Sequence, residues 1–218
     1  MPKDYCAARP ISTLVDTNLT AWDQDYRLRG RLWGSSAKGM PDLPENARIL
    51  ELGCGDGKTL AALAGSGRKV AALDVSLQAL QLCRSVSPVA ALILADACRL
   101  PFKQESFDIV FAFHVAGHLL LPGRHALARE VSRVLSSGGS LFFREFCVED
   151  MRAGQGMETE PGTFRRGRGI LTHYFTKGEV EALFCGLLPA IVGTHRWNLR
   201  VKGENMLRSE IEATFLKI

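Results

Sequence analysis

Residues 49–58 read Ile-Leu-Glu-Leu-Gly-Cys-Gly-Asp-Gly-Lys, and this stretch decides the fold. An apolar run ends in three glycines at alternating positions, Gly53, Gly55 and Gly57, and a helical pattern begins at Lys58. The pattern predicts a strand, a sharp turn and a helix start. Glycine permits a positive φ in such a turn and lets a ligand lie against bare backbone. The helix N-terminus then presents unpaired N–H groups to a polar ligand.

The carboxylate of Glu51 gives the first indication of the ligand. The spacing G-x-G-x-G differs from the G-x-G-x-x-G of pyrophosphate-binding turns, and Glu51 precedes the first glycine by two positions. A carboxylate in a partly buried cleft attracts an ammonium group, and S-adenosylmethionine carries one on its methionine part. The pattern favours an S-adenosylmethionine site over the glycine-rich turn of another nucleotide binder, although short glycine motifs also occur by chance.

Composition sets broad limits on the protein. The 218 residues suit one domain, and contents of 46% hydrophobic and 23% charged residues are ordinary for a soluble globular protein. The sequence starts without a secretory pattern and contains no apolar run long enough for a bilayer, so we expect a cytoplasmic protein without a membrane partner. Six scattered cysteines without a C-x-x-C pair predict reduced thiols and no metal site. The net charge of +4 permits a nucleic-acid partner without requiring one.

Strand and helix patterns alternate along the chain from residue 48. Strands are expected at 49–52, 69–73, 89–94, 107–113 and 140–143, and helices at 58–65, 76–86 and 124–135, with a turn at 136–139. Apolar stretches at 188–193 and 205–216 are expected to complete the sheet as a hairpin. Alternation of this kind predicts an α/β fold with a mostly parallel sheet and helices on both faces. In such sheets the ligand lies beyond the carboxyl ends of the strands.

Polar residues follow these strand ends. Asp74, with Val75 after it, ends the second strand and can accept both ribose hydroxyls, the alternative being a helix N-cap. Asp96 ends the third strand, where its carboxylate can accept from the adenine amino group while the Ala97 N–H donates to a ring nitrogen. A plain loop aspartate is the alternative.

The fourth strand brings an aromatic residue and an imidazole, Phe113 and His114, to the rim of the cleft. His114 is a candidate to contact the substrate as a base or as a hydrogen-bonding group. Methyl transfer from a sulfonium needs mainly positioning, so no catalytic residue is assigned. His118 and His125 are expected to be cap or surface residues.

The N-terminal part, residues 1–44, is predicted to be an irregular arm over residues 1–16, a helix over 20–32 and a linker over 34–44. Trp22, Tyr26 and Trp33 can pack on the sheet or cover a ligand in the cleft. Residues 45–218 form the main domain. A glycine-rich basic segment, residues 144–176, is inserted in that domain near the strand ends.

The order and spacing of these motifs resemble class I S-adenosylmethionine-dependent methyltransferases over residues 48–143. The resemblance implies a Rossmann-like sheet of seven strands whose last strand runs antiparallel. The residues expected to hold the cofactor are Glu51, Gly53, Cys54, Gly55, Asp74, Val75, Asp96, Ala97 and Phe113.

The C-terminal third resembles the tRNA 3-methylcytidine methyltransferase group. The matching positions are Arg144, Arg166, Gly167, Gly169, Tyr174, Phe175 and Thr176. The chain departs from that group in the segment Val-Ala-Gly-His-Leu-Leu-Leu-Pro-Gly after the fourth strand, in Arg168 where an acidic residue is usual, and in lacking an evident added RNA-binding domain. Fold and cofactor therefore transfer well to this chain, and the RNA substrate transfers poorly.

Without the resemblance, the inserted segment can cover the cleft and bind an anion through Arg165, Arg166 and Arg168. The alternative is a solvated hairpin. Thr176 and Glu179 predict a capping box for the next helix.

These observations predict an S-adenosylmethionine-dependent methyltransferase that acts by direct displacement. A base nitrogen of tRNA is one candidate acceptor, and a small anionic metabolite is the alternative. A non-catalytic partner subunit is a further alternative, while the glycine spacing and Glu51 disfavour a nicotinamide-dependent oxidoreductase. The substrate-facing candidates are His114, Arg144, Arg166 and Tyr174. The oligomeric state is left open.

Overall fold

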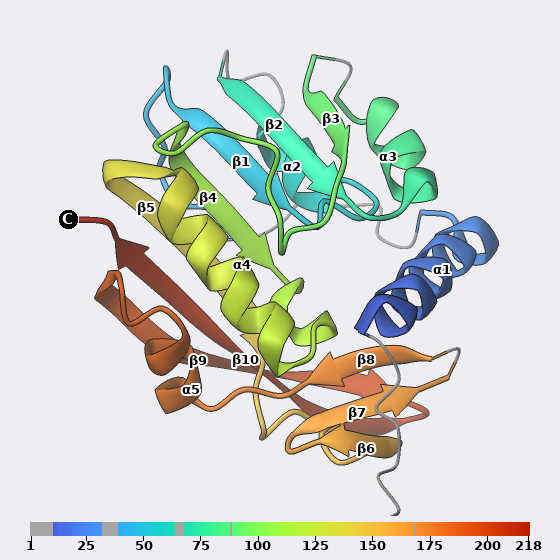
Figure 1. Cartoon of the computed structure of the whole chain (residues 1–218). Coiled ribbons are helices and arrows are strands. Elements are labelled where there is room, and N and C mark those ends of the chain that lie inside the picture. The colour runs from blue at the N-terminus through green and yellow to red at the C-terminus, as the bar shows by residue number, and fades with distance from the viewer. Residues whose placement is uncertain (1–10, 32–38, 64–67, 88, 168) are drawn as a thin grey trace, which may run out of the picture.

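The computed structural model describes residues 11–31, 39–63, 68–87, 89–167 and 169–218. Its main sheet has seven strands in the order β3-β2-β1-β4-β5-β10-β9 (Figure 1). The bounds of these strands are β1 Arg48–Leu52, β2 Lys69–Asp74, β3 Ala91–Leu94, β4 Phe107–Phe113, β5 Leu135–Phe146, β9 Leu188–Val201 and β10 Glu204–Leu216.

The pairing of the strands confirms the expected fold class. Strands β1 to β5 pair in parallel, and β10 pairs antiparallel with both β5 and β9. The chain order reverses between β1 and β4, so the carboxyl ends of these two strands flank the switch point of the sheet. The sheet therefore places its ligand site at the ends of β1 and β4 and of the strands beside them.

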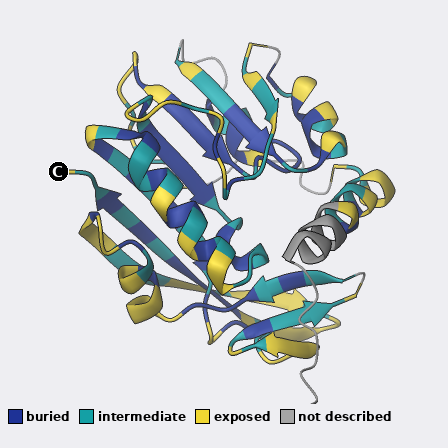
Figure 2. Cartoon of the chain, in the orientation of Figure 1, coloured by how far each residue is buried: buried dark blue, intermediate teal, exposed yellow. Residues whose placement is uncertain are grey.

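Helices cover the sheet on both faces, as Figure 1 shows with α4 in front of the sheet and α2 behind it. The helices are α1 Ile11–Arg29, α2 Lys58–Leu63, α3 Leu77–Arg84, α4 Leu121–Val134 and α5 Lys177–Leu183, with a short 3₁₀ turn, η1, at Ala116–His118. The two central strands are the most buried part (Figure 2), with Ile49, Leu50, Val110 and Phe111 fully inaccessible to solvent. Their runs of consecutive apolar residues are typical of strands covered on both faces.

A second, antiparallel sheet lies beside the carboxyl ends of the main strands, near α1 (Figure 1). It consists of β6 Met157–Glu160, β7 Thr163–Arg166 and β8 Ile170–His173 in that order. Strands β7 and β8 of this sheet pair antiparallel as a hairpin. Strand β6 was not predicted, because its sequence Met-Glu-Thr-Glu offers no apolar alternation.

Several predicted boundaries are wrong. Helix α1 begins at Ile11, so residues 11–16 are helical and not irregular; their β-branched and polar residues have low helix propensity and concealed the pattern. Strand β5 starts at Leu135, so the predicted turn at 136–139 is an irregularity in its pairing with β4. Strand β5 also runs to Phe146 and includes Arg144, which was assigned to the inserted segment. Trp33 and Arg168 lie outside the described residues. Among the described helices, none is long and apolar enough to span a membrane.

Candidate functional site

The glycine turn after β1 has the geometry that its sequence predicted. Gly53, Gly55 and Gly57 have φ values of +63°, +54° and +84°, which side-chain-bearing residues rarely adopt. A Cβ atom at Gly55 would lie 2.7 Å from the Tyr26 hydroxyl oxygen of α1. The turn therefore requires glycine both for its backbone conformation and for the close approach of α1.

Glu51 lies buried on β1, below this turn. One of its carboxylate oxygens, Oε2, has no hydrogen-bond partner among the described residues. Burial raises the pKa of the Glu51 carboxyl well above its usual range. A buried carboxylate with an unused acceptor is a site that a cationic group would stabilise in its ionised form.

Asp74 ends β2 and ties the glycine turn to the start of α3. Its Oδ2 accepts a hydrogen bond from the Gly55 N–H and its Oδ1 accepts one from the Ser76 N–H, both at 2.9 Å. Ser76, and not Asp74, is the N-cap of α3. Each carboxylate oxygen can accept more than one hydrogen bond, so Asp74 retains acceptor capacity toward a ligand.

Asp96 follows β3 and is held in place by its own turn, in which Oδ1 accepts from the Cys98 N–H at 2.8 Å. Ala97, the next residue, is buried. Asp74 and Asp96 thus stand at the ends of two adjacent parallel strands, β2 and β3. This is the arrangement that the sequence predicted.

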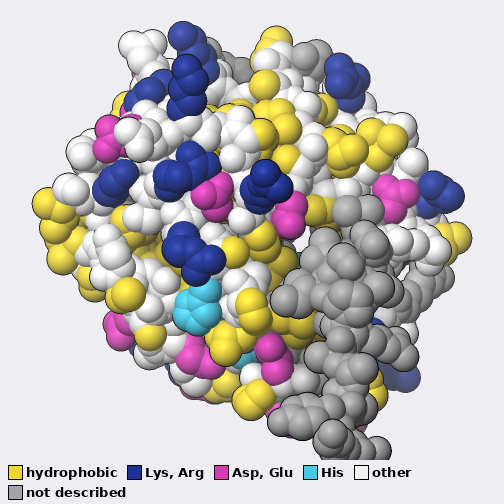
Figure 3. All heavy atoms as spheres, in the orientation of Figure 1, with side chains coloured by type: hydrophobic (Ala, Val, Ile, Leu, Met, Phe, Trp, Pro, Cys, Tyr) yellow, Lys and Arg dark blue, Asp and Glu magenta, His cyan; other side chains and the backbone are white. Residues whose placement is uncertain are grey.

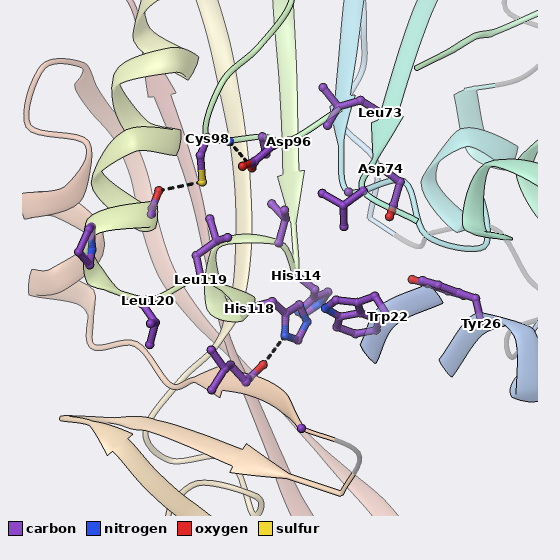
Figure 4. A pocket seen from close by; sticks show the side chains of 18 of the residues that line it. Trp22, Tyr26, Leu73, Asp74, Asp96, Cys98, His114, His118, Leu119 and Leu120 are labelled. Atoms are coloured by element: carbon purple, nitrogen blue, oxygen red, sulfur yellow. Dashed lines mark hydrogen bonds between the residues drawn. The ribbon is translucent and has the colours of Figure 1, made fainter. Parts of the chain in front are cut away.

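A cavity of about 430 Å³ opens at these strand ends. Figure 4 shows Asp74 and Asp96 on one part of its wall, and Leu119, Leu120 and His118 on another. The described lining residues come from α1, the strand ends, η1, the start of α4 and the β7–β8 hairpin. They are Trp22, Tyr26, Gly53, Leu73, Asp74, Val75, Asp96, Ala97, Cys98, His114, Val115, His118, Leu119, Leu120, Pro122, Gly123, Arg165, Gly169 and Leu171.

Aromatic residues of α1 close one side of this cavity. The Trp22 ring lies 5.7 Å from the Tyr26 ring in a stacked pair and 4.6 Å from the His118 ring in an edge contact (Figure 4). His118 Nδ1 in turn hydrogen-bonds the Leu171 carbonyl oxygen at 2.6 Å. Helix α1, η1 and β8 are thereby joined around the cavity. The expectation that His118 is a cap or surface residue is wrong, because its ring contacts both neighbouring elements and lines the cavity.

His114 reaches the cavity from the end of β4 with an unusual backbone, since its φ is +54°. Two carboxylates face its imidazole. Glu145 Oε2 lies 3.9 Å from Nδ1, and Glu210 Oε2 lies 3.4 Å from Nε2. Burial raises the pKa of Glu145 to about 7. This cluster could not be predicted from the sequence, because Glu145 and Glu210 are brought together only by the pairing of β5 with β10.

Other predicted residues do not line this cavity. Arg144 forms ion pairs with Glu210 and Glu212, and its guanidinium carbon lies 4.6 Å from the centre of the Phe113 ring. Arg166 donates a hydrogen bond to the hydroxyl of the buried Tyr174 at 2.9 Å. Both arginines thus contact protein groups, although the Nε of Arg144 has no hydrogen-bond partner among the described residues.

Three of the predicted cofactor residues, Cys54, Gly55 and Phe113, are not among the described residues that line the cavity and instead contact other protein groups. Gly55 uses its N–H on Asp74. Cys54 is buried with its Sγ 3.6 Å from that of Cys83. Phe113 packs its ring against Phe111, at 5.3 Å between ring centres.

Arg165 is the arginine that does line the cavity. The sequence grouped it with Arg166 and did not separate the two. Alternation along a β-strand places neighbours on opposite faces, and Thr163, on the same face as Arg165, is fully buried. Alternation therefore separates the two arginines, but only the orientation of β7 in the structure shows which of them faces the cavity.

Comparison with known proteins identifies the domain. A model of the methyltransferase domain family matches residues 50–143, which run from β1 into β5. The chain contains a class I methyltransferase domain. S-adenosylmethionine is the cofactor of this family. Residues on both sides of the matched range, among them Trp22 of α1 and Arg165 of β7, complete the cavity of the methyltransferase domain.

Individual relatives resemble the chain over part of their length. It is 29% identical over 165 residues to the 27-O-demethylrifamycin SV methyltransferase of Amycolatopsis mediterranei, covering 72% of this chain and 57% of that protein. It is 28% identical over 159 residues to the tRNA N(3)-cytidine methyltransferase METTL2 of Gallus gallus, covering 66% and 43%. The chain thus spans about half the length of these relatives.

A solved structure shows the same fold over the whole chain. It is the Burkholderia thailandensis 1,6-didemethyltoxoflavin-N1-methyltransferase with bound 1,6-didemethyltoxoflavin and S-adenosylhomocysteine. The TM-score is 0.66 at 15% identity, with 100% of this chain and 94% of that chain covered. At this identity the likeness concerns the fold.

The residues of the methyltransferase domain fit the family's cofactor. Glu51 has a buried carboxylate oxygen without a partner among the described residues, a group that an ammonium would stabilise. Glu51 is not among the lining residues, whereas Gly53 of the glycine turn above it lines the cavity. Asp74 and Asp96 line the cavity at successive strand ends, where hydroxyl and amino donors can be bound.

Proposed function

We propose that the chain binds S-adenosylmethionine in this cavity and transfers its methyl group to an acceptor by direct displacement. The observation that supports this most strongly is the continuity of the cavity. One space joins Asp74 and Asp96 to a second wall that carries His114 and Arg165.

Each part of the cofactor half has a proposed role. Glu51 and Gly53 bind the methionine part, Glu51 by attraction to the ammonium group, while Cys54 and Gly55 hold the turn in position. Asp74 and Val75 bind the ribose, and Asp96 and Ala97 bind the adenine. Phe113 and Gly55 support the site without lining it. Phe113 packs against Phe111, and the Gly55 N–H donates to Asp74 and so orients its carboxylate.

When bound, the cofactor supplies a methyl group attached to a positively charged sulfur, and the sulfur keeps the electron pair of the broken bond and becomes a neutral thioether. The protein has to align the acceptor with that methyl group and exclude water. Trp22 and Tyr26 of α1, with Leu171 of β8, provide apolar cover for this purpose. A protic acceptor loses one proton, and His114 is a candidate among the lining residues to orient that group.

Two acceptor classes are supported by different observations. A base nitrogen of tRNA is supported by the resemblance of the C-terminal third and by the similarity to the tRNA methyltransferase of Gallus gallus. A small anionic acceptor is supported by the cavity, whose second wall is largely apolar with one arginine. The retained Glu51, Asp74 and Asp96 oppose the alternative of a non-catalytic subunit.

Calorimetry and methyl transfer test the proposal together. We expect S-adenosylhomocysteine to bind with a stoichiometry of one, and Asp96→Ala to weaken binding at least tenfold. Labelled S-adenosylmethionine is then incubated with the protein and either unmodified tRNA or a small-molecule extract. Label in either acceptor that disappears with Asp96→Ala supports methyl transfer, and absence of S-adenosylhomocysteine binding contradicts it.

Two expectations from the sequence stay predictions. One is that residues 1–44 form an arm with a covering helix, and the other is that the protein is cytoplasmic.

A further inference from the structure

Arg165 is the one described cavity-lining residue with a permanent positive charge. Two carboxylates, Asp74 and Asp96, line the same cavity. His118 does not supply a second cation, since burial lowers its pKa to about 4 and leaves the ring neutral at pH 7. The imidazole of His114 faces Glu145 and Glu210. Among the described lining residues, Arg165 is therefore the permanent positive charge available to a ligand in this cavity.

The guanidinium of Arg165 has a buried nitrogen without a partner among the described residues. Its Nε is buried and has no hydrogen-bond partner among the described residues, and no described carboxylate forms an ion pair with it. The Nε of Arg144 also lacks a hydrogen-bond partner among the described residues, but the Arg144 guanidinium forms ion pairs with Glu210 and Glu212. Ion pairs join Arg124 to Glu160 and Arg208 to Asp150, each at 2.7 Å. A buried donor without a partner costs free energy unless a ligand or water meets it.

The surroundings of Arg165 are apolar. Leu171, its register partner on β8, lines the cavity beside it, and Leu119, Leu120 and Pro122 lie on the same wall. Trp22 adds a flat aromatic face, which Figure 4 shows between His118 and Tyr26. A charge-assisted pair is strong in such a low-dielectric site, and a guanidinium matches the planar oxygens of a carboxylate or the oxygens of a phosphate.

We propose that Arg165 binds an oxyanion on a small acceptor whose body is flat and apolar. This inference rests on the proposed methyl transfer and names the class of its acceptor. The distribution of charge favours this class over RNA, because Arg144, Arg124, Arg196 and Arg208 are each paired with a carboxylate. On the face shown in Figure 3, basic side chains are interspersed with acidic ones and form no continuous stripe. RNA binding depends on such a continuous basic surface.

The test measures binding of defined probes to the full chain saturated with S-adenosylhomocysteine. The anionic probes are 2-naphthoate and 2-naphthyl phosphate, which separate carboxylate from phosphate, and the neutral counterparts are 2-naphthamide and 2-naphthol. We expect at least one anion to bind tenfold or more tightly than its neutral counterpart. Arg165→Gln should abolish that preference and leave the affinity for S-adenosylhomocysteine within twofold. Arg129→Gln, which removes an exposed charge from α4, should preserve the preference.

The possible outcomes separate this inference from the proposed function. Binding of S-adenosylhomocysteine without any preference for an anionic probe would overturn the inference and leave the proposed function standing. A loss of S-adenosylhomocysteine affinity in Arg165→Gln would assign the arginine to the cofactor carboxylate and would also overturn it. Methyl transfer into tRNA that is unchanged in Arg165→Gln would have the same effect. Thermal melting of each variant identifies any that fails to fold, and Arg165→Lys then replaces it, with an expected partial loss of the preference.

Discussion

Glu145 makes the stability of the folded chain depend on pH near neutrality. Its side chain is 2% exposed, its Oε1 accepts the Gly117 N–H at 2.8 Å, and His114 and Glu210 are the titratable groups that face it across the imidazole. Burial raises its pKa to about 7. Replacement by glutamine keeps the shape and the acceptor for Gly117 and removes the ionisation.

The sign and size of the effect follow from linkage. A carboxyl whose pKa is higher in the folded state holds a proton there that the unfolded chain releases, so folded-state stability falls as pH rises from the ordinary value of 4.5 through about 7. The full pKa difference corresponds to about 3 kcal/mol. The wild type loses most of this stabilisation between pH 5 and pH 8. The free energy of unfolding of Glu145→Gln relative to the wild type should therefore increase by about 2–3 kcal/mol over that range.

Urea denaturation at half-unit steps from pH 5 to pH 8 measures this difference. Glu181→Gln, an exposed substitution on α5, serves as the control and should follow the wild-type profile. Parallel profiles for Glu145→Gln and the wild type would refute the reasoning. They would mean that His114 and the N–H groups of η1 hold Glu145 ionised in spite of its burial.

Three further substitutions test other parts of the structure. Gly55→Ala introduces a Cβ 2.7 Å from the Tyr26 oxygen at a φ of +54°, so it should weaken S-adenosylhomocysteine binding more than tenfold by calorimetry; unchanged affinity would show that α1 does not hold this position. Asp150→Ala leaves the buried Arg208 without its partner and should cost about 3–5 kcal/mol in urea denaturation; a cost below about 1 kcal/mol would show that solvent reaches the pair. Thr176→Ala removes half of the capping box of α5 and should cost about 1 kcal/mol, and equal stability would show that the cap is redundant.

The parts of the site that the sequence predicted are those that depend on local geometry. The glycine turn, Asp74 and Asp96 follow directly from strand ends, because parallel strands bring their carboxyl ends to one edge. Thr176 and Glu179 likewise form the predicted capping box, which spans a single helical turn.

The parts that the sequence did not predict depend on pairing between distant segments. Glu210 reaches His114 only because β10 pairs with β5. Arg165 and Arg166 look equivalent in sequence, and only the orientation of β7 turns one toward the cavity and the other toward Tyr174. Trp22 is expected either to pack on the sheet or to cover the cleft, and in the structure it contacts His118 and lines the cavity.

The attachment of the second sheet has a consequence for how this chain can be re-engineered. The excursion that contains β6, β7 and β8 leaves the main sheet at Cys147 and returns at Phe175, and a backbone bridge joins these two residues. Hydrogen bonds from Phe175 N to Phe146 O and from Val148 N to Phe175 O fasten the same junction.

The two ends of this excursion therefore lie side by side. We refer to residues 148–174, which lie between them, as the cassette. The family match ends at residue 143, just before this cassette begins. Exchanging the cassette between relatives would replace the wall that carries Arg165 and Leu171 while the glycine turn, Asp74 and Asp96 stay in place. The fold thus places Arg165 and Leu171 on a segment whose two ends meet, away from the strand ends that carry Asp74 and Asp96.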